Sequence, residues 1–345
     1  MPLNLTALED AIASQHERQP FSGVISVRQG GQTVFARAYG YANLAEQVPN
    51  TVETRFGIAS GGKTFTSVAV CQLVERGLAT FDTPLRDCTG GLLPRFDPGV
   101  TLHHLLTHSS GIPDYFDESV QDDYEALWRE RPMYSFRRPA DFLPLFADMP
   151  MQFKPGERWA YNNSGFIVLG LVVEHLSGMP FADYIEKNIF QPCGMNASGY
   201  FALDQLPGGT ALGYIATGDG GWRTNIYAIP VIGGGDGGAF TSAPDLARFW
   251  DALLGYKLLS QPTVAQMLTP HWRMPDREDT HYGYGLWLKQ RPGDSLAYYM
   301  LGGDPGVVFY SGCYPAAGVQ FTLLANTEEP ASPMFECIAP LLRLA

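Results

Sequence analysis

The stretch FGIASGGKTFTSVA, residues 56–69, places the hydroxyl of Ser60 three positions before the amine of Lys63. The residues from Arg55 to Ala59 are predicted to be extended, and apolar residues recur after Lys63 at helical spacing until Gly77. Because residues three apart at the start of a helix lie on one face, the hydroxyl and the amine are expected within hydrogen-bonding distance.

This pair allows two interpretations. Ser60 is a nucleophile if desolvation or other cations lower the pKa of Lys63 enough for the amine to accept a proton. The free N–H groups of the helix start then favour the developing negative charge. Alternatively, Ser60 is only a helix N-cap and Lys63 a solvated first-turn residue. The local sequence leaves both interpretations open.

Two further motifs carry groups that suit such a nucleophile. Tyr161 and Asn163 precede a predicted helix, and a phenol can act as a general base where a cation such as Lys63 stabilises the phenolate. The alternative is that Tyr161 is an interface aromatic and Asn163 a helix cap.

Gly302 and Gly303 end a predicted strand, where a substrate can lie close and a backbone N–H can complete an oxyanion hole with that of Ser60. The alternative is a hinge between two strands.

Strand and helix patterns predict an α/β (α+β) protein, an antiparallel sheet flanked by helices and built from both termini. Residues 1–80 and 231–345 are expected to form the α/β domain, and residues 81–230 a mainly helical insertion domain. The strands are predicted at residues 23–28, 33–40, 296–301, 307–314 and 319–325. The helices are predicted at the amphipathic N-terminus, after Lys63, and at residues 102–106, 140–146, 165–176, 246–254 and 332–344.

Composition narrows the classes of partner. The chain has 345 residues and a net charge of −12, which argues against nucleic acid or an anionic membrane as a partner. No apolar run approaches the length of a membrane span. Five scattered cysteines without a C-x-x-C pair favour reduced thiols, and residues 1–10 lack the features of a signal peptide. We therefore expect a cytoplasmic protein.

Two other motifs are assigned no chemistry. His104 and His108 are four positions apart, but no glutamate follows His104 and no third ligand is evident, so no metal site is expected. The run Gly233-Gly234-Gly235-Asp236-Gly237-Gly238 lacks the Gly-Lys-Ser/Thr ending of a phosphate loop and the setting of a dinucleotide fingerprint. It is interpreted as a tight crossing of the chain.

Taken together, the motifs resemble those of the serine β-lactamase and penicillin-binding-protein superfamily, and most closely its class C-like, esterase-type branch. Ser60-x-x-Lys63 is similar to the nucleophile motif, Tyr161-x-Asn163 to the Tyr-x-Asn motif, and Gly302-Gly303 to the glycines of the third motif. Further similar segments are residues 101–115, 153–161, 190–195 and 237–249. The resemblance covers roughly residues 5 to 343 and implies the fold of that superfamily.

The resemblance implies a serine hydrolase that needs no cofactor. Ser60 would be acylated, Lys63 and Tyr161 would share the roles of base and acid, Asn163 would orient Lys63 and the substrate, and Gly303 would help to hold the oxyanion.

The chain departs from the family pattern at two positions. Gly62 stands where a Ser or Thr is usual. Met300 stands where the family has a strand cation that binds a substrate carboxylate, unless Arg223 or His281 replaces it. We therefore expect an esterase that acts on a small-molecule ester. The alternatives are a D-amino-acid amidase or peptidase, a weak β-lactamase, and an inactive binding or scaffold protein.

Overall fold

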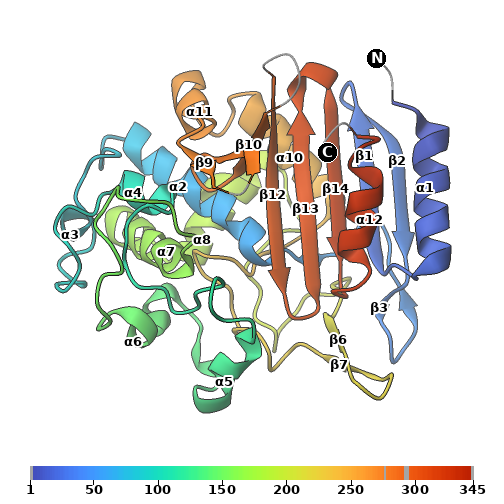
Figure 1. Ribbon diagram of the computed structural model, residues 1–345, viewed down its shortest axis with the longest axis horizontal. Coiled ribbons are helices and arrows are strands. Elements are labelled where there is room, and N and C mark those ends of the chain that lie inside the picture. Colours follow the sequence, from blue (N-terminus) through green and yellow to red (C-terminus); the bar gives the residue numbers. More distant parts are fainter. Residues whose placement is uncertain (1–2, 276, 291–294, 343–345) are drawn as a thin grey trace.

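The computed structural model describes residues 3–275, 277–290 and 295–342, and an eight-stranded antiparallel sheet lies at its centre (Figure 1). The strand order is β2-β1-β14-β13-β12-β11-β10-β9. The bounds are β1 Gly23–Gln29, β2 Gln32–Tyr39, β9 Trp272–Met274, β10 Arg277–Tyr282, β11 Trp287–Gln290, β12 Leu296–Asp304, β13 Val307–Tyr314 and β14 Val319–Ala325. The predicted fold class is confirmed, and the sheet extends through β9–β11, which were not predicted.

The two ends of the chain meet at the pairing of β1 with β14. The register places Val27 opposite Phe321 and Ile25 opposite Leu323. Successive residues of β1 are buried on both faces of the sheet, because helices cover both of them. Such continuous apolar runs are typical of strands without a solvated face.

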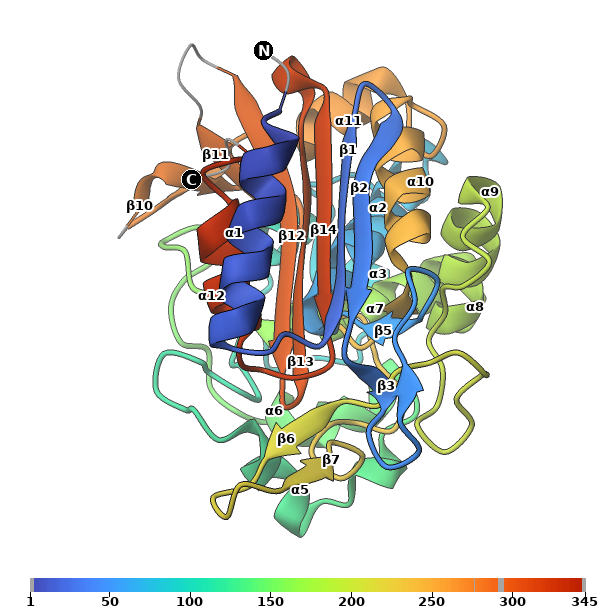
Figure 2. The same ribbon diagram turned by 90° about the vertical axis from the view of Figure 1, so that its right-hand side faces the viewer.

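Two helices cover one face of the sheet, α1 (Leu5–Arg18) and α12 (Ala331–Ile338) (Figures 1 and 2). Leu8 and Ile12 share a buried cluster with Met334 and Ile338. The predicted closing helix was too long. It ends at Ile338 and a turn follows, since Pro340 has no N–H to continue the helical hydrogen bonds. The predicted part at 343–344, like residues 1–2 of the first helix, lies outside the described residues.

The opposite face carries α2 (Lys63–Glu75) and α10 (Ala243–Leu254) (Figure 2). Trp250 of α10 donates its indole N–H to the Ser311 hydroxyl of β13 at 3.0 Å. The helix α7 (Asn163–Ser177) packs on α2. One buried cluster joins α2, α7 and this face of the sheet, so the helices between the sheet-forming ends share a core with the sheet.

The remaining elements are short. The helices are α3 Leu85–Cys88, α4 Leu102–Leu106, α5 Leu127–Glu130, α6 Leu143–Phe146, α8 Phe181–Ile185, α9 Gln191–Cys193 and α11 Gln261–Met267. Three small sheets pair β3 (Tyr41–Asn43) with β4 (Val48–Pro49), β5 (Phe56–Gly57) with β8 (Phe240–Thr241), and β6 (Tyr214–Ala216) with β7 (Trp222–Thr224). Helices outnumber strands within residues 81–230, although most of these residues lie in loops, and the division into a sheet-based domain and a mainly helical insertion domain stays a prediction.

Within the described residues, no individual helix has both the length and the apolar composition to cross a bilayer. Residues Asn163–Ser177 and Phe181–Cys193 meet that test only jointly, as a pair bent by 75°, on length and composition alone. All five cysteines are free thiols, four of them buried.

Candidate functional site

Ser60 lies in a 3-10 turn, Ala59–Gly62, that leads into α2. The turn is held from both sides, since Ile58 donates its N–H to the carbonyl of Ala239 and Ala59 accepts one from Gly238. Ala59 has φ +44°, a conformation that costs a non-glycine residue about 1 kcal/mol or more. The strain falls on the residue directly before the candidate nucleophile, and the neighbouring backbone fixes it there.

Lys63 makes three polar contacts through its buried amine. Its Nζ lies 2.9 Å from the Ser60 hydroxyl, 2.8 Å from Asn163 Oδ1 and 2.6 Å from the backbone carbonyl of Asp236. The side chain is 1% exposed. The alternative of an N-cap is wrong, because no side chain caps α2 and the Ser60 hydroxyl faces the amine instead.

Burial lowers the pKa of Lys63 below its ordinary value, and the carboxylates of Asp236, Glu118, Asp114 and Asp304 act in the opposite direction. A neutral amine has two N–H donors and one lone pair. Asn163 Oδ1 and the Asp236 carbonyl can only accept, so in the neutral state the lone pair faces the hydroxyl of Ser60. The arrangement therefore suits a lysine that takes the serine proton.

The carbonyl of Asp236 was not predicted as part of the site. It belongs to the glycine-rich run, which the structure confirms as a tight crossing with reciprocal contacts between Gly234 and Gly237. Gly235 passes so close to α7 that a Cβ would lie 2.1 Å from the Phe166 carbonyl. The only sequence signal for this role is the density of glycines, which predicts a close approach but no partner.

Tyr161 and Asn163 are brought to the amine by the N-terminus of α7. Asn162, not Asn163, is the helix cap, and its side chain accepts from the N–H of Gly165. The Asp114 carboxylate accepts from the N–H groups of Asn163 and Ser164, both at 2.9 Å. Asn163 is therefore free to present its oxygen to Lys63, and the alternative that made it the cap is wrong.

The ring of Tyr161 lies beside the amine, with Lys63 Nζ 4.9 Å from its centroid. Burial raises the pKa of Tyr161 well above its ordinary value, Glu118 adds to this, and a hydrogen bond with Ser60 opposes it. The phenol is thus held protonated next to the serine hydroxyl, which suits it better as a proton donor than as the resting base.

His108 supports the same loop. Its Nδ1 accepts from the N–H of Asn162, so the neutral ring carries its proton on Nε2, 3.0 Å from the Tyr282 hydroxyl. Its ring centroid lies 4.4 Å from that of Tyr161. Burial, with Lys63 as a second cause, lowers the pKa of His108 well below its ordinary value. This neutral ring fixes the position of Tyr161, a role that the sequence analysis missed.

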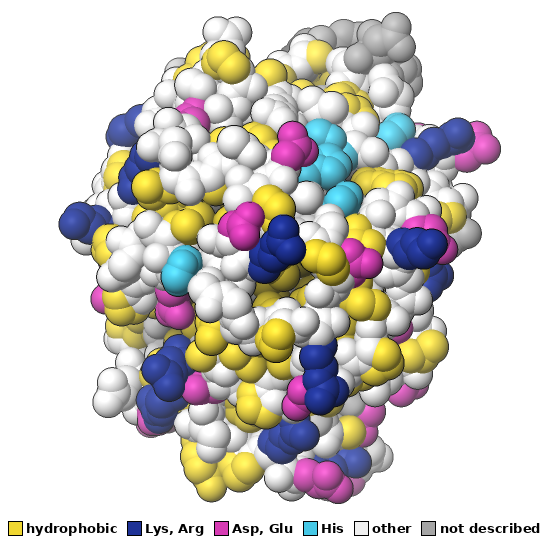
Figure 3. Space-filling model, turned by 90° about the vertical axis from the view of Figure 1, so that its left-hand side faces the viewer, with side chains coloured by type: hydrophobic (Ala, Val, Ile, Leu, Met, Phe, Trp, Pro, Cys, Tyr) yellow, Lys and Arg dark blue, Asp and Glu magenta, His cyan; other side chains and the backbone are white. Residues whose placement is uncertain are grey.

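His104 and His108 have separate partners, since His104 Nδ1 accepts from the backbone N–H of Thr101 in a capping box. Several histidine side chains lie near one another on the face shown in Figure 3. The ring of His103 contacts those of His104 and His271. Among the described residues, no group of three metal-binding side chains occurs.

The third motif lies within a strand rather than at a hinge. β12 runs through both glycines, and its turn with β13 begins only after Asp304. A Cβ on Gly302 would lie 2.2 Å from the Ile58 carbonyl and 2.9 Å from Ser60 N, so this glycine lets the strand pack directly on the serine turn. Gly303 borders the cavity beside Ser60.

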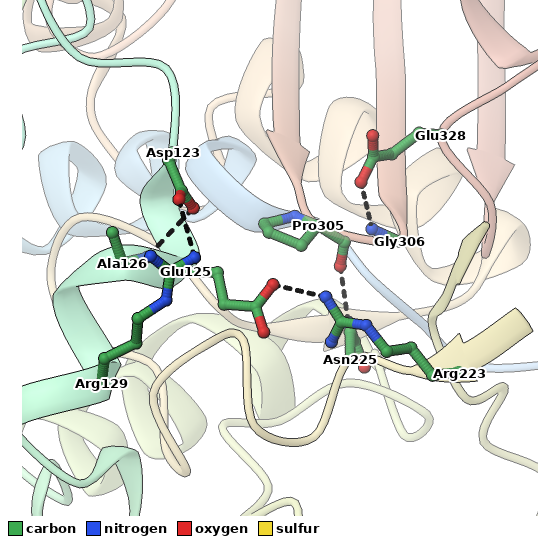
Figure 4. A network of polar contacts seen from close by, with 9 residues as sticks. All are labelled: Asp123, Glu125, Ala126, Arg129, Arg223, Asn225, Pro305, Gly306 and Glu328. Carbon is green, nitrogen blue, oxygen red and sulfur yellow. Dashed lines mark hydrogen bonds and ion pairs between the residues drawn. The ribbon is translucent and has the colours of Figure 1, made fainter. Parts of the chain in front are cut away.

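None of the described residues that line this cavity is a cation that could replace the strand cation expected from the family pattern. Met300 is 1% exposed and belongs to the apolar core. Arg223 is paired with Glu125 (Figure 4), and His281 lies in β10. Neither Met300, Arg223 nor His281 is among the described residues that line the cavity.

The cavity beside Ser60 has a volume of about 780 Å³. Asn163, Gly303 and the hydroxyl of Ser60 border it, together with apolar side chains such as Phe142 and Ile229. It is large enough for a small organic substrate. A nucleophile, its amine and a cavity therefore meet at one place.

The sequence matches the model of the family described as Beta-lactamase over residues 8–342. The chain belongs to this family. Its superfamily consists of serine hydrolases that include esterases, aminopeptidases and penicillin-binding proteins, so the resemblance read from the motifs is confirmed.

Three relatives illustrate the similarity. The crystal structure of a penicillin-binding protein from Bacillus halodurans is 49% identical, with a TM-score of 0.91 over 96% of this chain and 99% of that one. Esterase EstB of Burkholderia gladioli is 32% identical over 58% of this chain and 53% of its own length. A D-aminopeptidase of Cereibacter sphaeroides is 30% identical over 83% of this chain and 53% of its own length. The chain spans about half to two thirds of the length of the curated relatives it matches.

Proposed function

We propose that this member of the family hydrolyses small carboxylic esters through an acyl-enzyme at Ser60. The observation that carries the proposal is the triple contact of the Lys63 amine with Ser60, Asn163 and the Asp236 carbonyl. A buried amine with a lowered pKa beside a serine hydroxyl is the arrangement that activates this weak nucleophile.

In the first half-reaction, neutral Lys63 accepts the Ser60 proton as Oγ attacks the ester carbonyl. The backbone N–H groups of Ser60 and Gly303 stabilise the oxyanion. As the intermediate collapses, the C–O bond to the alcohol breaks and Tyr161 donates its proton to the leaving oxygen, regaining one from Lys63. In the second half-reaction a water molecule gives a proton to neutral Lys63 as it attacks the acyl carbonyl, and the C–O bond to Ser60 then breaks as Oγ takes this proton back from Lys63, which releases the acid.

Esters are favoured over substrates that carry a carboxylate near the bond to be cleaved. The buried, apolar Met300 offers no cation to such a carboxylate. An ester also needs less protonation of its leaving group than an amide does. The similarity to an esterase supports this assignment, and the similarity to a D-aminopeptidase supports amide hydrolysis as the second candidate.

The test is turnover of p-nitrophenyl acetate and labelling by a fluorophosphonate, with the wild type and Ser60→Ala compared. We expect both signals in the wild type and neither in the variant. A wild type that is inert to both reagents would instead indicate a protein that keeps the fold as a binding or scaffold module. Brisk turnover of nitrocefin would contradict the argument from Met300.

A further inference from the structure

Two oxygen atoms hold the Lys63 amine beside the Ser60 hydroxyl. One is Asn163 Oδ1, at 2.8 Å, and the other is the backbone carbonyl of Asp236, at 2.6 Å. A displacement of about 1 Å in a reacting group can lower a rate about a hundredfold. The residues that fix these two acceptor atoms therefore contribute to the reaction through Lys63.

The carbonyl of Asp236 lies in a run of backbone that has few restraints of its own. Asp236 is the one residue of the run 233–238 that has a side chain, and glycine is the least restricted residue. The Tyr115 hydroxyl donates to the Asp236 carboxylate at 2.5 Å. This hydrogen bond anchors the run through its one side chain, next to the carbonyl that faces Lys63.

Tyr115 is itself fixed in place. It is 6% exposed, its ring centroid lies 5.6 Å from that of Phe142, and its N–H donates to the Ser164 hydroxyl at 2.8 Å. Burial raises the pKa of Tyr115 well above its ordinary value, and the Asp236 charge adds to this. The hydroxyl is therefore protonated. Since its one proton is directed at Asp236, the Tyr124 hydroxyl, 3.2 Å away, is the donor in its contact with Tyr115.

Asp114, the preceding residue, fixes the other acceptor. Its buried carboxylate accepts from the backbone N–H of Asn163 at 2.9 Å. The Phe116 carbonyl accepts from Asn163 Nδ2 at 3.2 Å. Because the amide nitrogen donates to Phe116, the amide oxygen is directed at Lys63. Residues 114–116 thus set both the position and the orientation of this amide.

We propose that Asp114 and Tyr115 are positioning residues for the hydrolysis, because between them they hold both oxygen atoms that accept from the Lys63 amine. Asp114 acts through the backbone of Asn163, and Tyr115 acts through the side chain of Asp236. The inference rests on the proposed function, in which this amine takes the serine proton.

Capping of α7 does not require the Asp114 carboxylate. Asn162 already caps this helix by accepting from a backbone N–H of the first turn. Burial raises the pKa of Asp114 to about 7, although its hydrogen bonds with Ser164 and Asn163 and the charge of Lys63 lower it. The ionised form of Asp114 therefore costs free energy of folding, which is typical of a residue that serves activity rather than stability.

The first test is Asp114→Asn, with p-nitrophenyl acetate at pH 8 and kcat expressed per folded protein from circular dichroism. An asparagine offers one acceptor oxygen where two N–H groups converge, so Asn163 should shift. We expect kcat to fall about tenfold and KM to stay within about twofold. In an Asn163→Ala background, where the amide oxygen is already gone, the same change should lower kcat by less than about twofold. A merely structural role would give the same loss in both backgrounds.

Asp245→Asn is the control for this change. Asp245 is also buried, and its carboxylate accepts from the backbone N–H of Ala197 at 2.8 Å. It is not among the described residues that line the cavity. Its replacement should leave kcat within about twofold of the wild type.

The second test is Tyr115→Phe, which removes a single hydroxyl. We expect kcat to fall about tenfold with KM within about twofold. In an Asp236→Ala background the further loss should be less than about twofold, because Tyr115 acts through that side chain. Tyr184→Phe is the control, since its buried hydroxyl also donates to a side chain, that of Gln72 at 3.2 Å, and its kcat should be unchanged.

Wild-type kcat in Tyr115→Phe, or tenfold losses that persist in the two alanine backgrounds, would overturn this inference and leave the proposed function standing. If Asp114→Asn does not fold, Tyr115→Phe and its Asp236→Ala background decide alone. Absence of Ser60-dependent turnover in the wild type would overturn both the inference and the proposed function.

Discussion

The charge state of Lys63 decides what Ser60 can do. Burial disfavours the ammonium form, while the surrounding carboxylates favour it, and burial is the larger effect. Three acceptor atoms around one amine would satisfy an ammonium ion equally well, but an ammonium ion cannot accept the proton of Ser60. Activity therefore depends on the fraction of the protein in which this amine is neutral.

We expect kcat/KM for a methyl ester to rise with pH through a midpoint below 10.5, the ordinary value for lysine. The sign follows from the lowered pKa of Lys63, because the amine loses its proton at a lower pH than a solvated lysine does. Lys63→Met should reduce kcat/KM by about 10² to 10⁴, whereas Lys257→Met, at an exposed lysine, should not. A flat profile between pH 6 and 10 would contradict this role.

A second prediction concerns stability at Asp304. Its pKa is raised from 3.8 to about 8 in the folded protein, so the folded state binds the proton more tightly than the unfolded state. The contribution of the protonated Asp304 carboxyl to the free energy of unfolding is fully present below pH 4 and is lost as the pH rises through 8. Asp304→Asn, which cannot ionise, should gain stability relative to the wild type between pH 5 and pH 9, by several kcal/mol at about 1.4 kcal/mol per unit of pKa shift. Urea unfolding at pH 5 and 9 measures the difference, and an equal gap at both values would exclude ionisation as its cause.

Among the helices and strands, the site residues that could be predicted from the sequence are reactive residues in segments whose secondary structure is evident from the local pattern. Ser60 and Lys63 are three apart on one turn, and the strand that carries Gly303 is rich in apolar and aromatic residues. The contribution of the Asp236 carbonyl was not found, because every residue has a backbone carbonyl and only the tertiary path selects one of them. The role of His108 was missed for a similar reason, since its partners Asn162 and Tyr282 come from distant segments.

The same limit explains the errors in secondary structure. The strands β9–β11 are short and lie at one edge of the sheet. Pairing with one another and, through β11, with β12 stabilises them more than their own sequence does. The closing helix was predicted to run past Pro340 because the apolar periodicity continues there. The helical hydrogen bonds of the backbone cannot continue through Pro340, which has no N–H.

The glycine-rich crossing provides a test at this scale. Gly235→Ala would place a Cβ 2.1 Å from the Phe166 carbonyl, so the crossing must shift and carry the Asp236 carbonyl away from Lys63. We expect kcat to fall about tenfold or more, as it does when catalytic groups are displaced by about 1 Å, with a loss of stability of a few kcal/mol. In Gly218→Ala the new Cβ meets no atom within 4 Å, and both quantities should be unchanged. Wild-type kcat in Gly235→Ala would show that the carbonyl does not position the amine.

At the scale of the whole molecule, one apolar core links the sheet to the helices. The cluster that contains Phe309 of β13 also contains Phe65 of α2 and Phe166 of α7. The two predicted domains therefore share buried surface, and the site lies where they meet. Unfolding of either the sheet or the helices that pack on it should therefore expose buried apolar residues of the other.

We expect Ile25→Ala, at a fully buried position of β1, to destabilise the protein by about 2–5 kcal/mol. Because β1 holds the sheet that carries Gly303, Ser60-dependent turnover and far-UV circular dichroism should be lost together within each protein, at a lower urea concentration in the variant than in the wild type. Val48→Ala, at a position 45% exposed, is the control and should change stability little. Activity that persists after the sheet has unfolded would show that the two parts are independent.

The pairing of β1 with β14 also constrains how the protein is made. The Ser22 hydroxyl donates to Asn326 across 304 positions of sequence. The strand β1 therefore cannot pair with β14 until nearly the whole chain has left the ribosome. At 5–20 residues per second, that delay is roughly 15 to 60 s. During this time the β1–β2 hairpin exposes apolar residues on an unpaired edge, which invites association with other nascent chains. Chaperone demand during synthesis is therefore a consequence of building one sheet from both ends.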